Sequence, residues 1–181
     1  QFRCDQITRL VKTVSEEAHR LKPYVKVSAD VFGDYPKCRD DIGQDWLLWC
    51  QQGYLDFVCP MTFQERDYDY QQQVGRLVEL VNGVVPVYLG IGAYLNPDEG
   101  VVAQTEIARR AGADGHVLFQ LGPDMAATLL PKLALGIAAA PSTAPHAGPL
   151  VRFAPAGPGA VKVSVLGSGQ RAQLILQNHL V

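Results

Sequence analysis

Charge of either sign is scarce in this 181-residue sequence. Charged residues make up 19%, and 16 Lys and Arg stand against 18 Asp and Glu, which gives a formal net charge of -2. The chain therefore lacks the basic excess that neutralises phosphates, which excludes a nucleic-acid-binding protein. No apolar run approaches the roughly 20 residues that a membrane-spanning helix needs. Hydrophobic residues still reach 48%, which favours a folded core over disorder.

Metal ligands and cofactor loops are also sparse. The four cysteines are 34, 12 and 9 residues apart without a CxxC pair, and the four histidines are scattered singly, so we expect no metal site. A dinucleotide-binding loop starting at Gly90-Ile91-Gly92 would need a third glycine where Leu95 stands. The sequence therefore predicts no cofactor. Cys50 and Cys59 lie in apolar segments and are expected to be core residues, not a disulfide.

Four apolar segments recur with a nearly constant period. They start at Tyr24, Leu55, Val85 and Gly115, which are 31, 30 and 30 residues apart, and each is followed by a segment with helical spacing. This pattern predicts four consecutive βα units with parallel strands. A (β/α)8 TIM barrel has about 31 residues per unit over about 250 residues, so the period fits such a barrel and the number of units supplies half of one. The expected strands are Tyr24–Phe32, Leu55–Phe63, Val85–Ala93 and His116–Leu121.

The helices between these strands are expected from spacing and end signals. Phe2–Leu21 carries one apolar face, and a polar loop with Asp40-Asp41 precedes the short helix QDWLLWCQQ. Asn96 is expected to cap a helix that begins at Pro97, with Glu99 completing a capping box. The other expected helices are Asp67–Asn82 and Pro123–Ala138, the latter kinked at Pro131.

Composition changes abruptly after Ala138, which divides the chain into a barrel-like domain over 1–138 and a tail over 139–181. Residues 139–160 are rich in Ala, Pro and Gly and are expected to form a linker. Val161–Gln177 alternates apolar and polar residues around Gly167-Ser168-Gly169, which predicts a β-hairpin. We expect this tail to be a linker followed by a short β segment.

Chemistry in parallel α/β proteins gathers at the carboxyl ends of the strands. Aromatic rings beside carboxylates and amides suit sugars there, because apolar sugar faces pack on rings while hydroxyls need polar partners. We expect Asp45 and Asp30 as catalytic candidates. The expected substrate-binding residues are Tyr35, Gln44, Trp46, Met61, Phe63, Tyr94 and Gln120.

Each of these candidates also has a structural interpretation. Trp46 and Trp49 are three residues apart and equally fit the apolar face of a helix, and Asp45 equally fits a helix cap. Asp30 equally fits a solvated loop carboxylate. Residues at strand starts belong to the end of the sheet that serves stability, so we expect no catalytic role for Asp56, Asp114 or His116. His19 is expected to be an exposed helix residue.

Four segments of the sequence resemble the glycosyl-hydrolase-like family 10 barrel of bacteria: FRCDQITRLV, QDWLLWC, GYLDFVCPM and GIGAY. The resemblance covers roughly residues 1–138 and none of the tail. It implies a glycoside hydrolase at the bacterial envelope, periplasmic or extracellular, with a polysaccharide substrate such as the glycan strands of peptidoglycan. Asp30 departs from the small residue common in the family, and Phe63 stands close to where Tyr is common.

The resemblance also implies that these are the last four strands of the barrel and that the family's acidic strand-end motif lies upstream of Gln1. Glycosidases need two carboxylates, so we expect at most one of them here. We further expect an uncovered inner face with Val58, Val87, Leu89, Val117 and Phe119 on it. A missing amino-terminal half-barrel or a second copy of the chain would complete the barrel.

Two other functions stay open. The first is a non-catalytic protein that binds carbohydrate or assembles from half-barrels. The second is a small doubly wound α/β protein that binds an anion, although the chain lacks the glycine-rich loop typical of that class.

Overall fold

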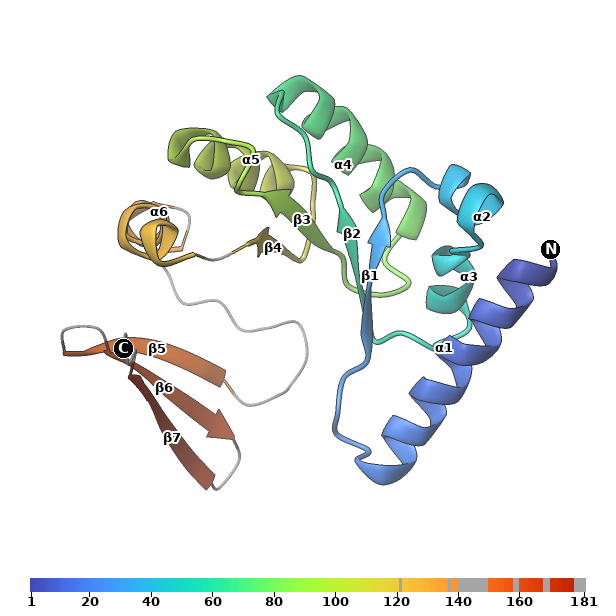
Figure 1. Ribbon diagram of the computed structural model, residues 1–181, viewed down its shortest axis with the longest axis horizontal. Coiled ribbons are helices and arrows are strands. Elements are labelled where there is room, and N and C mark those ends of the chain that lie inside the picture. The colour runs from blue at the N-terminus through green and yellow to red at the C-terminus, as the bar shows by residue number, and fades with distance from the viewer. Residues whose placement is uncertain (121, 137, 140–149, 158–159, 168–169, 178–181) are drawn as a thin grey trace. The chain divides into compact units, whose positions relative to one another are not determined.

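The computed structural model describes residues 1–120, 122–136, 138–139, 150–157, 160–167 and 170–177 (Figure 1). The chain divides into two compact units, Gln1–Ala140 and Pro141–Val181. The first contains all six helices of the described residues and a parallel sheet, and the second contains an antiparallel sheet.

The sheet of the first unit has four strands in chain order, and every neighbouring pair is parallel. Its strands are β1 (Ser28–Phe32), β2 (Phe57–Met61), β3 (Tyr88–Gly92) and β4 (Gly115–Phe119). The strands alternate with helices along the chain. The predicted α/β class with four parallel βα units is therefore confirmed, and the arrangement is that of half a TIM-barrel-like repeat.

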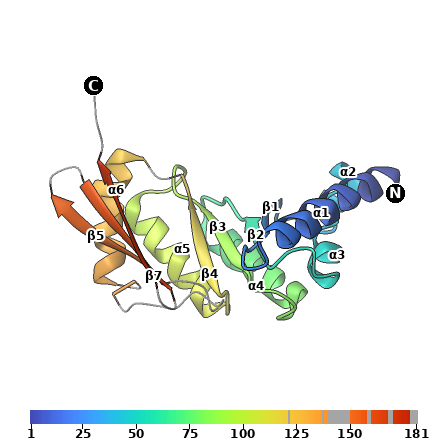
Figure 2. The ribbon, with the colours of Figure 1, turned by 90° about the horizontal axis from the view of Figure 1, so that it is seen from below.

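Six helices accompany these strands (Figures 1 and 2): α1 (Phe2–Leu21), α2 (Lys37–Ile42), α3 (Trp46–Gln51), α4 (Asp67–Val81), α5 (Asp98–Arg110) and α6 (Pro123–Leu135). α4 and α5 lie side by side. α6 continues through Pro131. No helix among the described residues is long and apolar enough to cross a membrane.

Two local predictions were wrong. The polar stretch around Asp40-Asp41 forms α2 instead of a loop, because Cys38 is buried in the core and Gly43 ends the helix with a positive φ of 81°. The capping box at α5 is not formed: the helix begins at Asp98 without a side-chain cap. Asn96 instead donates its amide to backbone carbonyls, as described below.

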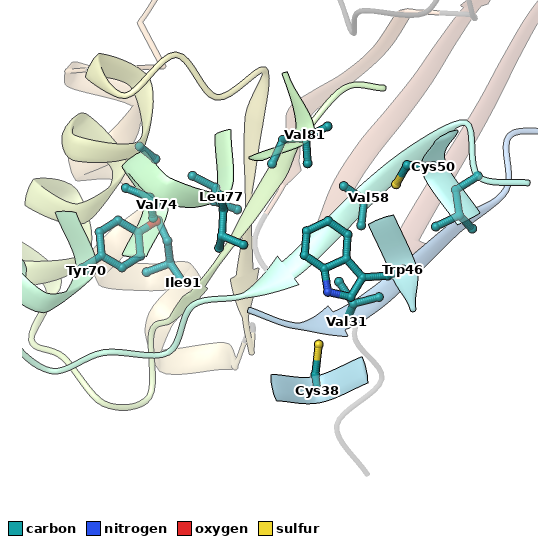
Figure 3. Close-up of a cluster of buried hydrophobic side chains, with 14 of the residues drawn as sticks. Val31, Cys38, Trp46, Cys50, Val58, Tyr70, Val74, Leu77, Val81 and Ile91 are labelled. Carbon is teal, nitrogen blue, oxygen red and sulfur yellow. The ribbon is translucent and has the colours of Figure 1, made fainter. Parts of the chain in front are cut away.

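One hydrophobic cluster joins the helices to one face of the sheet. Val31, Val58 and Leu89 are fully buried there, and Figure 3 shows Trp46 among Val31, Val58 and Cys38. Val58 and Leu89 were expected on the uncovered inner face, and so was Val87, which is also buried in this cluster. The apolar pattern did not distinguish the two faces, because both faces of these strands carry apolar residues.

The alternate residues of each strand point their side chains to the opposite face of the sheet. In a parallel sheet, residues paired in register share a face, so Phe32, Met61 and Gly90 form one row with Val117. The side chains of Phe32, Val117 and Phe119 are 50%, 40% and 49% exposed. We call this the open face. The expectation for Val117 and Phe119 agrees with this placement.

Two aspartates tie neighbouring strands together where the strands start. The Asp56 carboxylate accepts the backbone N–H of Val27 at 2.8 Å, and the Asp114 carboxylate accepts that of Val87 at 2.9 Å. Asp56 also binds His19 at 3.1 Å, so His19 is not the free exposed residue that was expected. These contacts give both aspartates the structural role expected for that end of the sheet.

Replacing Asp56 with Asn is expected to lower the free energy of unfolding by roughly 1 to 2 kcal/mol at pH 7. Burial alone would raise the pKa of Asp56, but the Val27 N–H, Lys26 and His19 outweigh it and lower that pKa below its usual 3.8. A lowered pKa contributes stability that is fully present above the unfolded value and is lost as the pH falls through the folded value.

Urea titrations of the wild-type chain and the variant at pH 7 and below pH 4 check this prediction. The stability difference should shrink at the acid end, where the wild-type carboxylate also takes up its proton. Glu65→Gln, which changes an exposed carboxylate before α4, is the control. A difference that stayed constant across this range would contradict the ionic role of Asp56.

The second unit is a three-stranded antiparallel sheet in the order β5-β6-β7. Its strands are β5 (Leu150–Gly157), β6 (Ala160–Gly167) and β7 (Gln170–Gln177). β6 and β7 pair around the predicted turn, of which residues 168 and 169 lie outside the described residues. β5 falls in the segment expected to be a linker, because its apolar residues at 150, 151 and 153 were hidden by the surrounding Ala, Pro and Gly. Residues 140–149 of that expected linker lie outside the described part.

Candidate functional site

The predicted site residues follow the carboxyl ends of the four strands. Gln44 and Asp45 lie beyond the end of β1, Phe63 beyond β2, Tyr94 beyond β3 and Gln120 directly after β4. Met61 is the last residue of β2, and Tyr35 lies between β1 and α2. In a parallel sheet, these ends meet at one edge.

Three aromatic rings meet at this edge, and we call them the aromatic platform: Phe63, Tyr94 and Phe119. Phe63 stacks on Phe119 with ring centroids 5.4 Å apart, and Tyr94 meets both rings edge-on at 6.1 and 6.0 Å. Tyr94 is 58% exposed and Phe119 49%. The sequence analysis placed Phe63 and Tyr94 among the binding residues but missed Phe119, although it ends the fourth strand.

Two glycines of β3 make room for the platform. A Cβ on Gly92 would lie 3.2 Å from the Cβ of Phe63 and 3.0 Å from Leu95. A Cβ on Gly90 would lie 3.2 Å from the Phe63 ring and 3.1 Å from the Pro60 carbonyl oxygen. The small residues of GIGAY therefore serve close packing against Phe63.

Replacing Gly92 with Ala is expected to push Phe63 away and lower the free energy of unfolding by about 1 to 3 kcal/mol, as overpacking does. Gly75→Ala is a matched control, because a Cβ there meets nothing within 4 Å in the middle of α4. That change should stabilise the chain by about 0.5 to 1 kcal/mol. Urea unfolding measures both, and equal effects of the two changes would contradict the packing role of Gly92.

Two side-chain amides, of which Gln104 is buried, hold the loop that carries Phe63. The Gln64 carbonyl accepts the side-chain N–H groups of Gln104 at 2.8 Å and Asn96 at 3.1 Å. Asn96 also donates to the Gly92 carbonyl at 3.2 Å, and the Thr62 hydroxyl donates to the Gly90 carbonyl at 2.6 Å. These contacts link the end of β2 to the end of β3 beneath the platform. The contact of Gln104 was not predicted, because an amide on a helix carries no positional signal, and Asn96 was expected to cap α5 instead.

Gln44, in the loop before α3, and Trp46, the first residue of α3, both bind the backbone of Phe32. The Gln44 side-chain oxygen accepts the Phe32 N–H at 2.9 Å, and the Trp46 indole donates to the Phe32 carbonyl at 3.1 Å. Trp46 is 0% exposed, so its ring presents no face to a substrate. The prediction that Trp46 binds substrate is corrected here: it is a core residue. Trp49 is buried as well and donates to the Thr8 hydroxyl at 2.8 Å.

Asp45 lies between Gln44 and Trp46 in the chain and binds Tyr35. The Tyr35 hydroxyl donates to Asp45 Oδ1 at 3.0 Å, and Asp45 makes no side-chain hydrogen bond to the start of α3. The capping interpretation of Asp45 is therefore wrong. Asp45 lines an open cleft of about 1000 Å³ that also contains Arg3, Arg39, Asp40 and Asp41. Asp45 is therefore held by Tyr35 and borders a polar, open surface.

The second candidate carboxylate, Asp30, is exposed on the open face, where it pairs in register with Cys59. Burial raises the pKa of the Cys59 thiol to about 12, and the negative charge of Asp30 and a hydrogen bond to it contribute. The thiol therefore stays protonated at neutral pH. Cys59 and Cys50 are both buried free cysteines, as expected.

The described residues contain no group of three or more His, Cys, Asp or Glu side chains that could hold a metal ion. The predicted side chains at the strand ends are carboxylates, a phenol, amides and aromatic rings. This is the combination that suits a carbohydrate.

Comparison with known proteins agrees with this chemistry. A family model described as glycosyl hydrolase-like 10 matches residues 1–105, which is more than half of the chain and extends from α1 into α5. No curated protein matches the chain. The match includes Gln44, Asp45, Phe63 and Tyr94, whereas Phe119 lies beyond it. The chain belongs to the glycosyl hydrolase-like 10 family.

Proposed function

We propose that this chain binds a polysaccharide across the carboxyl ends of its strands and contributes a carboxylate to the hydrolysis of glycosidic bonds. The aromatic platform carries this proposal. Two of its three rings are about half exposed and all three rings touch one another, and a contiguous exposed apolar patch is typical of a binding site. Apolar faces of sugar rings pack on such a surface, and the amide of Gln120 next to Phe119 supplies a polar partner for hydroxyls.

Asp45 and Asp30 are the two candidates for the one catalytic carboxylate that this chain is proposed to contribute. Asp45 is held by Tyr35 and lines the polar cleft, whereas Asp30 lies on the open face beside Cys59. A glycosidase uses two carboxyl groups, about 5 to 5.5 Å apart for retention and about 6.5 to 9.5 Å for inversion. We favour Asp45, because Asp30 departs from the residue common in the family.

The proposed substrate is a bacterial envelope polysaccharide, such as the glycan strands of peptidoglycan, in the periplasm or outside the cell. Membership of the glycosyl hydrolase-like 10 family supports a glycosidic substrate, and the envelope polysaccharide is what the resemblance to bacterial members implies. Gln44 and Met61 are proposed to line the substrate-binding mouth, which is the surface at the carboxyl ends of the strands. The unit over 139–181 is proposed to be a separate appended β module.

We also propose that the four-stranded sheet is one half of an eight-stranded barrel. β1 and β4 are edge strands, and the open face exposes Phe32 and Val117. Closing a barrel removes such edges and covers such a face. An amino-terminal half-barrel, or a second copy of the chain, would supply the other four strands.

A non-catalytic carbohydrate-binding protein is the second candidate function. The aromatic platform supports it directly, because stacking on rings needs no carboxylate pair.

Two assays on the purified 181-residue chain separate these functions. Retention on immobilised peptidoglycan glycans and other polysaccharides measures binding, and release of reducing ends measures hydrolysis. Retention with turnover that Asp45→Asn abolishes would support the enzyme. Retention without turnover, also after an amino-terminal half-barrel is added, would favour the binding protein. Absence of retention on every polysaccharide would contradict both.

A further inference from the structure

Both backbone polar groups of Phe32 are bound by side chains. β1 is an edge strand, and the backbone of Val27 pairs toward β2 through Asp56. Because backbone groups alternate along a strand, those of Phe32, five residues later, point to the free edge. Gln44 accepts the N–H there and Trp46 donates to the carbonyl, so two side chains replace a neighbouring strand at this one residue.

The residue between these two anchors is Asp45. Its position directly before α3 is where an aspartate would normally cap the helix, a contact that stabilises by about 1 kcal/mol. Asp45 makes no such contact and accepts the Tyr35 hydroxyl instead. The Tyr35 ring in turn meets the Trp46 ring edge-on, with centroids 5.2 Å apart. The side chains of this segment thus contact one another as well as the Phe32 backbone: Asp45 binds Tyr35, and Tyr35 packs on Trp46.

We propose that Gln44 and Trp46, the two sequence neighbours of Asp45, are positioning residues. By binding the Phe32 backbone with their side chains, they hold the Asp45 carboxylate at the carboxyl ends of the strands. This assigns a role to each residue of the Q-D-W segment: two anchors and one presented carboxylate. The value of the arrangement for catalysis rests on the proposed function, whereas the holding of Asp45 does not.

The pKa of Tyr35 depends on whether the Asp45 carboxylate stays in place. Burial raises the pKa of the Tyr35 phenol, and the hydrogen bond to Asp45 and its negative charge raise it further, against an opposing effect of Arg39. Arg39 lies over the ring at 5.6 Å, and Arg76 donates to the Tyr35 carbonyl. A carboxylate that moves away from the hydroxyl should therefore lower the pKa of Tyr35.

The test follows the titration of Tyr35 by NMR of tyrosine ring carbons in the full 181-residue chain, with the signal assigned from Tyr35→Phe. Asp45→Asn is expected to shift the midpoint downward. Gln44→Met and Trp46→Phe, which remove one anchoring hydrogen bond each, are expected to shift it in the same direction. Trp49→Phe is the matched control, because it removes an indole donor from the same helix. That donor binds the Thr8 hydroxyl and not the Phe32 backbone, so its loss should leave the midpoint unchanged.

A midpoint that falls with Asp45→Asn but with neither anchor variant would overturn the proposal, and so would an equal shift in Trp49→Phe. If Trp46→Phe does not fold, Gln44→Met carries the test, since Gln44 is only half-buried. An unchanged midpoint in Asp45→Asn would also overturn it. The titration needs no saccharide. A chain that shows these shifts yet binds no polysaccharide would therefore contradict the proposed function but not the positioning role of Gln44 and Trp46.

Discussion

A chain that carries both Phe63→Ala and Tyr94→Ala is expected to bind polysaccharide roughly 100-fold more weakly, about tenfold for each ring. The two rings belong to one platform with Phe119, so their removal takes away most of the apolar surface on which a sugar would pack. Affinity electrophoresis in gels that contain the polysaccharide measures the change in dissociation constant.

Tyr24→Ala and Tyr68→Ala are the controls for this experiment. Both tyrosines are more than 70% exposed, but Tyr24 precedes β1 at the other end of the sheet and Tyr68 lies on α4. Neither change should alter binding. A circular dichroism spectrum checks that the double variant is folded, since Phe63 is half-buried. If the folded double variant bound as tightly as the wild-type chain, the platform would not be the binding surface.

The fold was predictable because its signals are repeated. A period of 30 to 31 residues recurs three times, so an error at one boundary does not disturb the assignment of the others. What the pattern did not reveal is which face of each strand the helices cover. Val58 and Phe57 are neighbours of similar hydrophobicity, and only Val58 is in the helix-covered core. The difference arises from tertiary packing, which a single strand does not encode.

The candidate site was predictable only in part, for a different reason. Strand ends are readable from sequence, and they led to Tyr35, Phe63 and Tyr94. The partners of a polar side chain are not readable, because they come from segments that are distant in the chain. Asp45 had the sequence position of a helix cap, and its contact with Tyr35 depends on how the Phe32 backbone anchors the residues around it.

Trp46→Ala is expected to lower the free energy of unfolding by about 3 to 5 kcal/mol. Trp46 is fully buried among Val31 and Val58, so truncation opens a large cavity, and it also leaves the Phe32 carbonyl without its indole donor. Domains of this kind are stable by only about 5 to 15 kcal/mol, so the variant should be close to unfolding at 37 °C. Urea unfolding followed by far-UV circular dichroism measures the change without relying on tryptophan fluorescence.

Trp46→Phe separates the two parts of this effect. Phenylalanine keeps much of the ring in the core but has no N–H, so its cost should include the loss of one hydrogen bond, about 1 kcal/mol, and should stay well below that of alanine. Two tryptophans at helical spacing allowed either a sugar-binding surface or a buried helix face, and these interpretations predict stability losses of different size for Trp46→Ala. A substrate-facing Trp46 would tolerate alanine with a loss of less than about 1 kcal/mol, as exposed positions do, and would lose polysaccharide binding instead. A large loss of stability with Trp46→Ala, and a small loss with Trp46→Phe, therefore makes Trp46 the anchor of the segment and leaves sugar stacking to the aromatic platform.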